Sequence, residues 1–152
     1  MHASDSIVVA RPPTAVFEFM DVPENQARIS PRLSAVDTVG VRDDGAKLAS
    51  YTYRLLGLSF DGTVEGIEHE PPETIAFEMT GDIAGHIRWQ FDPVDTGTRV
   101  TYTAAYDLGL PSAVTWLVEP FVGRVNQREI TRTLANLQHA LESRPLDTAD
   151  ER

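Results

Sequence analysis

The sequence predicts an α+β protein in which a curved antiparallel β-sheet of about seven strands wraps around one long C-terminal helix. From Ala35 to about Leu108, short runs of alternating apolar and polar residues are separated by turn signals such as Asp43-Asp44-Gly45. From Ser112 to Ser143, apolar residues recur at spacings of three and four, as they do on one face of a helix. Short turns join antiparallel neighbours, so the strands are expected to form a meander.

The N-terminal segment predicts one short strand followed by two short helices. The apolar run SIVVA, Ser6–Ala10, is typical of a strand. Pro13 presets the backbone for a first helical turn, and apolar residues follow it at helical spacing in AVFEFM. A second helix is expected over Glu24–Ile29, ending before Pro31.

Alternation within the strands predicts that the sheet has one buried face, here called the dry face, and one solvent-exposed face, here called the wet face. Between Arg99 and Leu108 every second residue is apolar or aromatic, and Arg88 and Asp92 alternate onto the wet face of their own strand. The dry face comprises Tyr51, Tyr53, Leu55, Leu58, Phe60, Val64, Ile75, Phe77, Met79, Ile87, Trp89, Phe91, Val100, Tyr102, Ala104, Tyr106 and Leu108. The alternation slips near Gly66, where a bulge is expected. The long helix is the segment left to cover the dry face.

That helix contains two residues that disfavour helices, Pro120 and Gly123, in WLVEPFVGRV. A proline inside a helix removes one hydrogen bond and typically costs roughly 3 kcal/mol, so a bend is expected there. Two accounts of the bend are open. It either fits the helix over a filled core, or it lifts the first half of the helix off the sheet and opens a cavity.

Length and composition suit a single domain over residues 1–143, followed by a flexible polar tail over 144–152. The first residues resemble no signal peptide, and no apolar run reaches the length of a membrane span. The chain has no cysteine, which excludes disulfides and fits a reducing compartment. We therefore expect a cytoplasmic protein without integral membrane association.

The formal net charge of −10 makes nucleic acid an unfavourable partner, because an excess of carboxylates repels phosphate backbones. Lys47 is the only lysine. An acidic composition with so little lysine is expected either of a halophilic host or of a GC-rich genome, and the sequence does not separate the two.

Two segments carry a resemblance to a known family: VVARPPTAVFEFM near the N-terminus and ITRTLANLQHALE near the C-terminus. Together with the order of elements from Ile7 to about Glu142, they resemble the START-like (helix-grip) SRPBCC superfamily, particularly polyketide cyclase/dehydrase-like proteins. The resemblance implies an apolar cavity between sheet and helix that holds lipids, sterols, quinones or polyketides. Some members of this superfamily are enzymes and others only bind.

The candidate ligand-binding residues lie on the dry face and on the first half of the helix. They are Tyr51, Tyr53, Phe60, Phe77, Met79, Trp89, Phe91, Tyr102, Tyr106, Leu117, Phe121 and Val125. The aromatic residues among them would fill an ordinary core equally well. The tyrosines are candidate polar anchors, because a buried phenol needs a hydrogen-bond partner. One of Arg124, Asn126, Gln127 and Arg128 could meet a ligand carboxylate.

No catalytic residue is assigned, since no histidine or carboxylate is placed inward by the pattern. His2, His69, His86 and His139 lack the spacing of metal ligands and are interpreted as surface residues. No metal or cofactor is expected.

The favoured function is binding of a small hydrophobic or amphipathic ligand by a carrier or sensor, such as a carrier for a lipid, quinone or polyketide. The alternatives are a polyketide cyclase or dehydratase acting in the same cavity, and a subunit or regulator without chemistry. The oligomeric state is left open.

Overall fold

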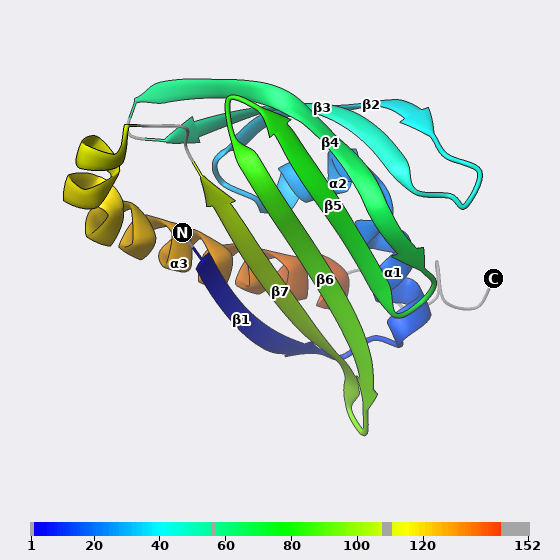
Figure 1. The fold of residues 1–152 in the computed structure, drawn as a ribbon. Helices are drawn as coiled ribbons and strands as arrows, with labels where there is room; N and C mark the ends of the chain where they lie inside the picture. Colours follow the sequence, from blue (N-terminus) through cyan, green and yellow to red (C-terminus); the bar gives the residue numbers. More distant parts are fainter. Residues whose placement is uncertain (1, 56, 108–110, 144–152) are drawn as a thin grey trace.

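The computed structural model describes residues 2–55, 57–107 and 111–143, which form seven strands and three helices (Figure 1). In chain order the elements are β1 His2–Val9, α1 Pro13–Met20, α2 Pro23–Ile29, β2 Leu33–Val41, β3 Lys47–Leu55, β4 Leu58–Glu70, β5 Thr74–Gly81, β6 Ala84–Val94, β7 Gly97–Asp107 and α3 Ser112–Glu142. The predicted tail at 144–152 lies outside the described residues.

The strands form one antiparallel sheet in the order β1-β7-β6-β5-β4-β3-β2. The predicted meander from β2 to β7 is confirmed, and β1 joins its far edge beside β7. The prediction of Ser6–Ala10 for the first strand was wrong at its start. The mostly polar segment from His2 to Asp5 lacks the apolar run of a strand, yet it pairs with Ala105 to Tyr102 of β7.

Prolines begin both short helices. Pro13 occupies the first turn of α1, as predicted, and Pro23 starts α2 one residue before the predicted boundary. A first-turn proline loses no helical hydrogen bond, because its N–H would be unpaired there in any case.

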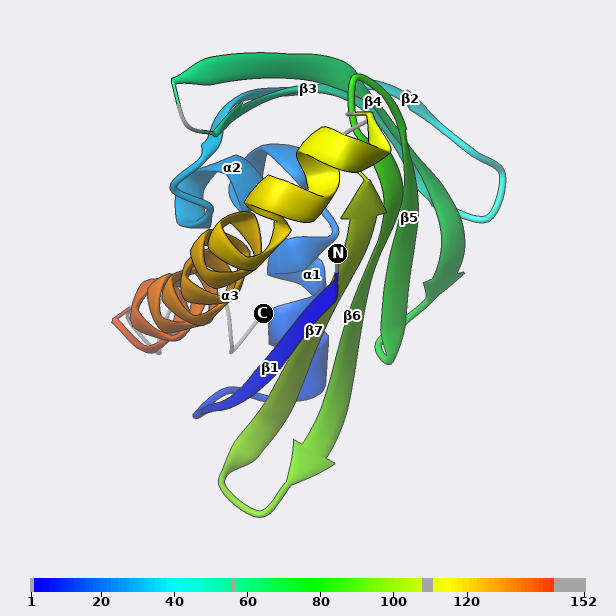
Figure 2. The ribbon, with the colours of Figure 1, turned by 60° about the vertical axis from the view of Figure 1, so that its left-hand side comes forward.

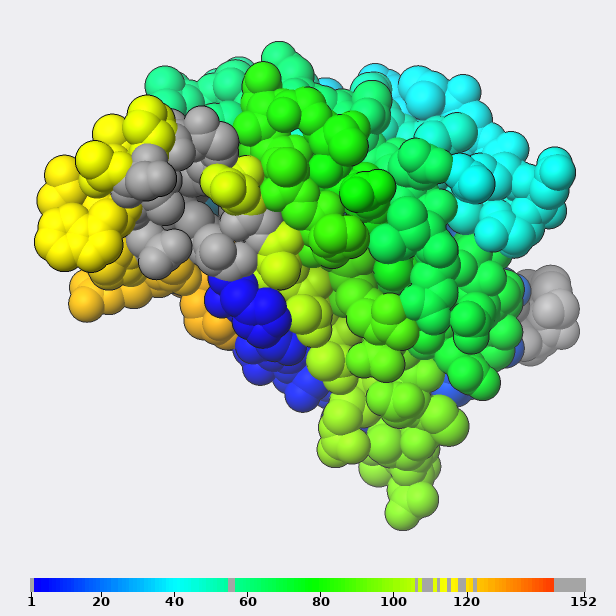
Figure 3. Space-filling view, viewed as in Figure 1, coloured from blue at the N-terminus to red at the C-terminus, as the bar shows by residue number. Residues whose placement is uncertain are grey.

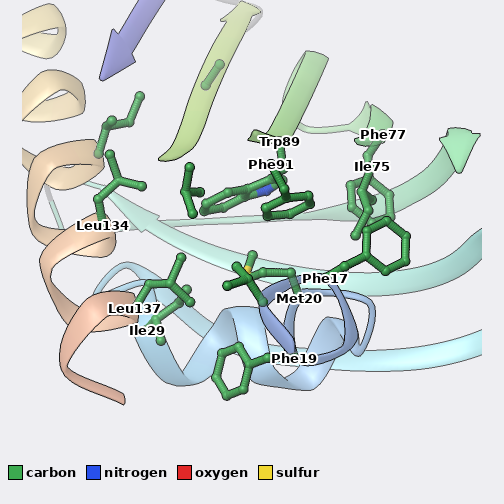
Figure 4. Close-up of a cluster of buried hydrophobic side chains, with 14 of the residues drawn as sticks. Phe17, Phe19, Met20, Ile29, Ile75, Phe77, Trp89, Phe91, Leu134 and Leu137 are labelled. Atoms are coloured by element: carbon green, nitrogen blue, oxygen red, sulfur yellow. The ribbon is translucent and has the colours of Figure 1, made fainter. Parts of the chain in front are cut away.

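The described side chains of the predicted dry face are buried or partly buried, with one exception, and the charged side chains of the wet face are exposed. Trp89, Phe91 and Val100 are buried, whereas Arg88 and Asp92 are exposed. Figure 4 shows Trp89 and Phe91 of β6 opposite Phe17 and Met20 of α1, with Leu134 and Leu137 of α3 to one side. The prediction was wrong for Leu58, which is exposed because it begins β4 beside the turn of the β3–β4 hairpin. The side chains of Leu55, Tyr106 and Leu108 lie outside the described part of the chain.

The expected bulge is present in β4. Its register with β5 shifts between Gly66 and Glu68, and Ile67 is turned to solvent. One extra residue in a strand increases its local bend, which fits the curvature of the sheet in Figure 2.

Helix α3 continues through Pro120, and its two halves differ in burial. Ile130, Leu134 and Leu137 are buried in the second half, which packs mainly on β1 and also contacts α2. Leu117 and Phe121 in the first half are 70% and 55% exposed. Figures 1 and 2 show the first turns (yellow) at an angle to the rest of the helix, and Figure 3 shows them projecting at one edge of the molecule. Within the described ranges, no helix is both long and apolar enough to cross a membrane.

Candidate functional site

A small cavity of about 40 Å³ lies between the sheet and α3. It is lined by Ser30, Leu33, Tyr53, Met79, Ile83, Ile87, Tyr102, Ala104, Asn126, Glu129 and Ile130. These residues come from the segment after α2, from β2, β3, β5, β6 and β7, from the turn before β6, and from α3. Apolar side chains dominate the lining, and the polar groups come from Ser30, the two tyrosines, Asn126 and Glu129.

Three of the predicted ligand-binding residues meet at this cavity: Tyr53, Met79 and Tyr102. The Tyr102 ring also stacks on its β6 neighbour Trp89, with ring centroids 4.0 Å apart and planes 6° from parallel. Tyr102, which lines the cavity, is thereby packed against Trp89 at the centre of the sheet.

The other predicted residues whose side chains the structure describes lie outside this cavity. Phe77 and Phe91 belong to the packed core, and Phe60 packs against it from a partly buried position. The Tyr51 hydroxyl donates to the backbone carbonyl of Ile83 at 3.3 Å. Burial raises the pKa of the Tyr51 phenol.

The residues predicted on α3 differ in their surroundings. Val125 lines a neighbouring cleft rather than the cavity, while Leu117 and Phe121 are exposed. Of the four polar residues proposed for a ligand carboxylate, Asn126 is buried and lines the cavity. Arg124, Gln127 and Arg128 are exposed.

The most distinctive polar contact in the cavity joins Tyr53 to Glu129. The Tyr53 hydroxyl donates a short hydrogen bond to the Glu129 carboxylate, linking β3 to α3. Only 9% of the Glu129 side chain is exposed, and Nε of Arg32 lies 4.0 Å from the same carboxylate oxygen. A carboxyl group therefore stands in the wall of an otherwise apolar cavity.

Burial raises the pKa of Glu129 above its ordinary value, because desolvation disfavours the charged carboxylate. The Tyr53 hydrogen bond and the Arg32 charge oppose this effect without cancelling it. The group thus favours its protonated form to a higher pH than an exposed glutamate does.

Glu129 was not among the residues predicted from the sequence, and the prediction that no carboxylate points inward was wrong. A signal was present, because residues three and four apart lie on one helix face. Glu129 follows Val125 by four positions and precedes Thr133 by four, and Thr133 is buried. A carboxylate on the face that continues into Ile130 and Leu134 could have been recognised from this spacing.

The interpretation of His69 as a surface residue was also wrong. Its side chain is 7% exposed, and its Nε2 lies 2.9 Å from Oδ1 of Asp21, which Lys47 also contacts at 3.3 Å. Its Nδ1 lies 2.9 Å from the backbone oxygen of Asp44. These contacts join β4 to the end of α1 and to the β2–β3 turn, which makes His69 a structural residue away from the cavity.

Glu129 also lines a second hollow, a cleft of about 200 Å³ beside the cavity. The other residues of the cleft are Pro31, Arg32, Val125, Arg128 and Arg132. Among the residues that the structure describes, no three histidine, aspartate or glutamate side chains are grouped as a metal site requires.

Chemically, the cavity combines an apolar wall with a phenol and a carboxyl that share a hydrogen bond. Such a pair can hold a hydroxyl or carbonyl oxygen of a ligand, or it can move a proton.

Comparison with known proteins identifies the same architecture in solved structures. A protein from Thermus thermophilus is similar with a TM-score of 0.82 and 19% identity, covering 95% of this chain and all (100%) of that one. An aromatase/cyclase from a Streptomyces species has a TM-score of 0.72 and 15% identity, over 94% of this chain and 96% of its own. A START superfamily protein from Mycobacterium smegmatis has a TM-score of 0.71 and 14% identity, over 93% and 97%. At sequence identities this low, the similarity shows a shared fold and does not by itself show a shared function.

No curated protein sequence matches this chain. The model of one family, described as polyketide cyclase/dehydrase and lipid transport, matches residues 1–142. That match covers both segments in which the sequence resembles the START-like superfamily, and the seven-stranded sheet with its long C-terminal helix has the helix-grip architecture. The chain therefore belongs to the polyketide cyclase/dehydrase and lipid transport family of START-like proteins.

Proposed function

We propose that this protein binds a small hydrophobic or amphipathic molecule, such as a lipid, quinone or polyketide, between the sheet and α3. The observation that carries the proposal is the Tyr53–Glu129 pair, which places hydrogen-bonding groups inside an apolar cavity. Ligand pockets commonly combine an apolar lining with a few converging polar groups that orient the ligand. The family, which includes lipid transport in its description, supports the same reading.

The cavity must enlarge to hold such a ligand. Its volume of about 40 Å³ is far below the roughly 300–1,000 Å³ of typical ligand pockets. On the α3 side the wall consists of Asn126, Glu129 and Ile130, so enlargement requires this part of the helix and the facing strands to move apart.

Calorimetric titration with decan-1-ol, a neutral amphiphile, tests this proposal. The wild type is expected to bind decan-1-ol saturably. Ala104→Leu fills the cavity from β7 and is expected to abolish binding, whereas Ala105→Leu makes the same change on the opposite face of the strand and preserves it.

Circular dichroism of both variants establishes that they are folded. Tyr53→Phe serves as a second probe that removes the hydroxyl with little change of volume. Absence of decan-1-ol binding to the wild type, or equal binding by both leucine variants, would contradict a ligand site in this cavity.

The same pair supports a second candidate, a cyclase or dehydratase. A carboxyl with a raised pKa is a stronger base once ionised and is closer to the pKa that suits acid–base catalysis near neutral pH. In dehydration of a β-hydroxy ketone, Glu129 would take the proton from the carbon next to the carbonyl. The carbon–oxygen bond to the hydroxyl then breaks, and Tyr53 protonates the departing oxygen to give water. Glu129 returns its proton to Tyr53 through their hydrogen bond.

This candidate is tested with a long-chain β-hydroxy ketone, whose dehydration forms a conjugated enone that absorbs ultraviolet light. The wild type is expected to accelerate the reaction and Glu129→Gln to remove the acceleration. A wild-type rate equal to the rate without protein would leave ligand binding as the function.

A further inference from the structure

The cleft beside the cavity is unusually basic for this chain. Of the six described residues that line it, three are arginines, Arg32, Arg128 and Arg132, and one, Glu129, is a carboxylate. These six residues carry a net charge of +2 when Glu129 is ionised and +3 when it is protonated, on a protein whose formal charge is −10. Because Glu129 lines both hollows, the cleft and the cavity meet at this residue.

Arg128 and Arg132 belong to a longer basic stripe on α3. Arg124, Arg128 and Arg132 follow one another at intervals of four, so they lie along one face of the helix beside a shallow concave surface. Like charges at this spacing destabilise a helix. Although the chain has 23 acidic residues, no salt bridge within the described ranges involves any of these three arginines.

Arg32 differs from the other two arginines of the cleft, because its Nε lies 4.0 Å from Glu129. It balances the charge of that carboxylate when Glu129 is ionised. Arg128 and Arg132 are both exposed and remain available to a ligand.

We propose that the cleft recognises the anionic head group of an amphiphile, a carboxylate, sulfate or phosphate, through Arg128 and Arg132. This inference rests on the proposed function, because the apolar part of the same molecule enters the cavity beyond Glu129. Guanidinium groups suit the task, since their fork of N–H donors matches the paired oxygens of such anions. The raised pKa of Glu129 reduces the repulsion that the incoming anion meets.

A single bound amphiphile fits the structure better than the surface of an anionic bilayer. The basic residues line a concave cleft next to an apolar cavity. A flat anionic surface would also meet the repulsion of a chain with a net charge of −10.

Calorimetric titrations with sodium decanoate and decan-1-ol at low ionic strength test the inference, because the two probes share one chain length and differ in charge. The wild type is expected to bind decanoate about tenfold or more tightly than decan-1-ol. Added salt is expected to weaken the binding of decanoate and to leave the binding of decan-1-ol unchanged. The double variant Arg128→Gln/Arg132→Gln is expected to lose the preference and to keep its affinity for decan-1-ol.

The matched control is Arg54→Gln/Arg99→Gln, which removes the same charge from two exposed arginines on strands β3 and β7. It is expected to keep the preference. Equal affinities of the wild type for both probes would overturn the inference and leave the proposed function standing. A preference that survives in Arg128→Gln/Arg132→Gln would overturn it as well.

Two further outcomes count against the inference. If the wild type binds neither probe, the proposed function falls together with the inference. If sedimentation with phosphatidylglycerol vesicles depends on Arg128 and Arg132 while decanoate does not bind, the arginines contact a bilayer and not the head group of a single ligand.

Discussion

Trp89→Ala and Trp116→Ala make the same substitution in opposite surroundings. Trp89 is 1% exposed at the centre of the sheet, where it stacks on Tyr102. Trp116 is 78% exposed on the first half of α3. The pair therefore compares a buried with an exposed position for the same residue type and the same substitution.

The expected losses of unfolding free energy follow from the buried areas. A buried aromatic side chain removes about 150–250 Å² from water, which at about 25 cal/mol per Å² stabilises the fold by roughly 4–6 kcal/mol. Substitutions of this kind are observed to cost about 3–5 kcal/mol, so we expect a loss of about 4 kcal/mol for Trp89→Ala. Only about a fifth of the Trp116 surface is buried. The higher helix propensity of alanine offsets part of the stability that is lost with this buried surface. The expected loss there is below about 1 kcal/mol.

Urea unfolding followed by far-ultraviolet circular dichroism measures both values without relying on the tryptophan signal. Equal slopes against urea would show that the variants differ in stability and not in the compactness of either state. In a chain of 152 residues, each 1 kcal/mol shifts Tm by roughly 2–4 °C, so Trp89→Ala should melt roughly 8–16 °C lower. A loss below about 1 kcal/mol for Trp89→Ala, or equal losses for both variants, would refute close packing around Trp89 and place its ring against open space.

Three further perturbations test the electrostatics and one turn. Because the native pKa of Glu129 is raised, the native state binds its proton more tightly than the unfolded chain, and wild-type stability falls as pH rises from the ordinary value of 4.5 through the raised one. Glu129→Gln should therefore gain stability relative to the wild type over that window in urea unfolding at a series of pH values, and a difference independent of pH would contradict the shift. Gly45 has φ of +91°, and an added Cβ would lie 2.7 Å from His69. Gly57 has φ of +79° with open space around it, so Gly45→Ala should lower Tm more than Gly57→Ala, and equal losses would exclude the clash. Molar KCl should raise Tm by screening carboxylate repulsion in this acidic chain, whereas a flat response would favour a compositional origin of the lysine scarcity.

The buried face of the sheet was predictable because it depends on a local property of strands. Successive side chains point to opposite faces, so the alternation through Val100, Tyr102 and Ala104 places all three on one side in any arrangement of the sheet. The stripe of Ile130, Leu134 and Leu137 predicted the packed face of α3 for the same kind of reason. Pro13 marked the start of α1 through its fixed φ.

The candidate site depends on contacts between residues far apart in the chain, and these were not predictable from local pattern. Tyr53 meets Glu129 across 76 positions, and His69 reaches Asp21 across 48. Spacing along α3 could place Glu129 on the inner face of the helix. That Tyr53 lies opposite Glu129 depends on how closely β3 approaches α3 in the folded protein. Pro120 predicted a bend in α3, whereas the size of the cavity depends on the curvature of the sheet and on how α3 packs against it. The sequence by itself therefore determined which face of the strands and of the second half of α3 is turned inward, because side-chain direction follows from backbone periodicity. The tertiary structure alone decided which of them meet at the cavity, because the distance between two elements is set by the packing of every residue between them.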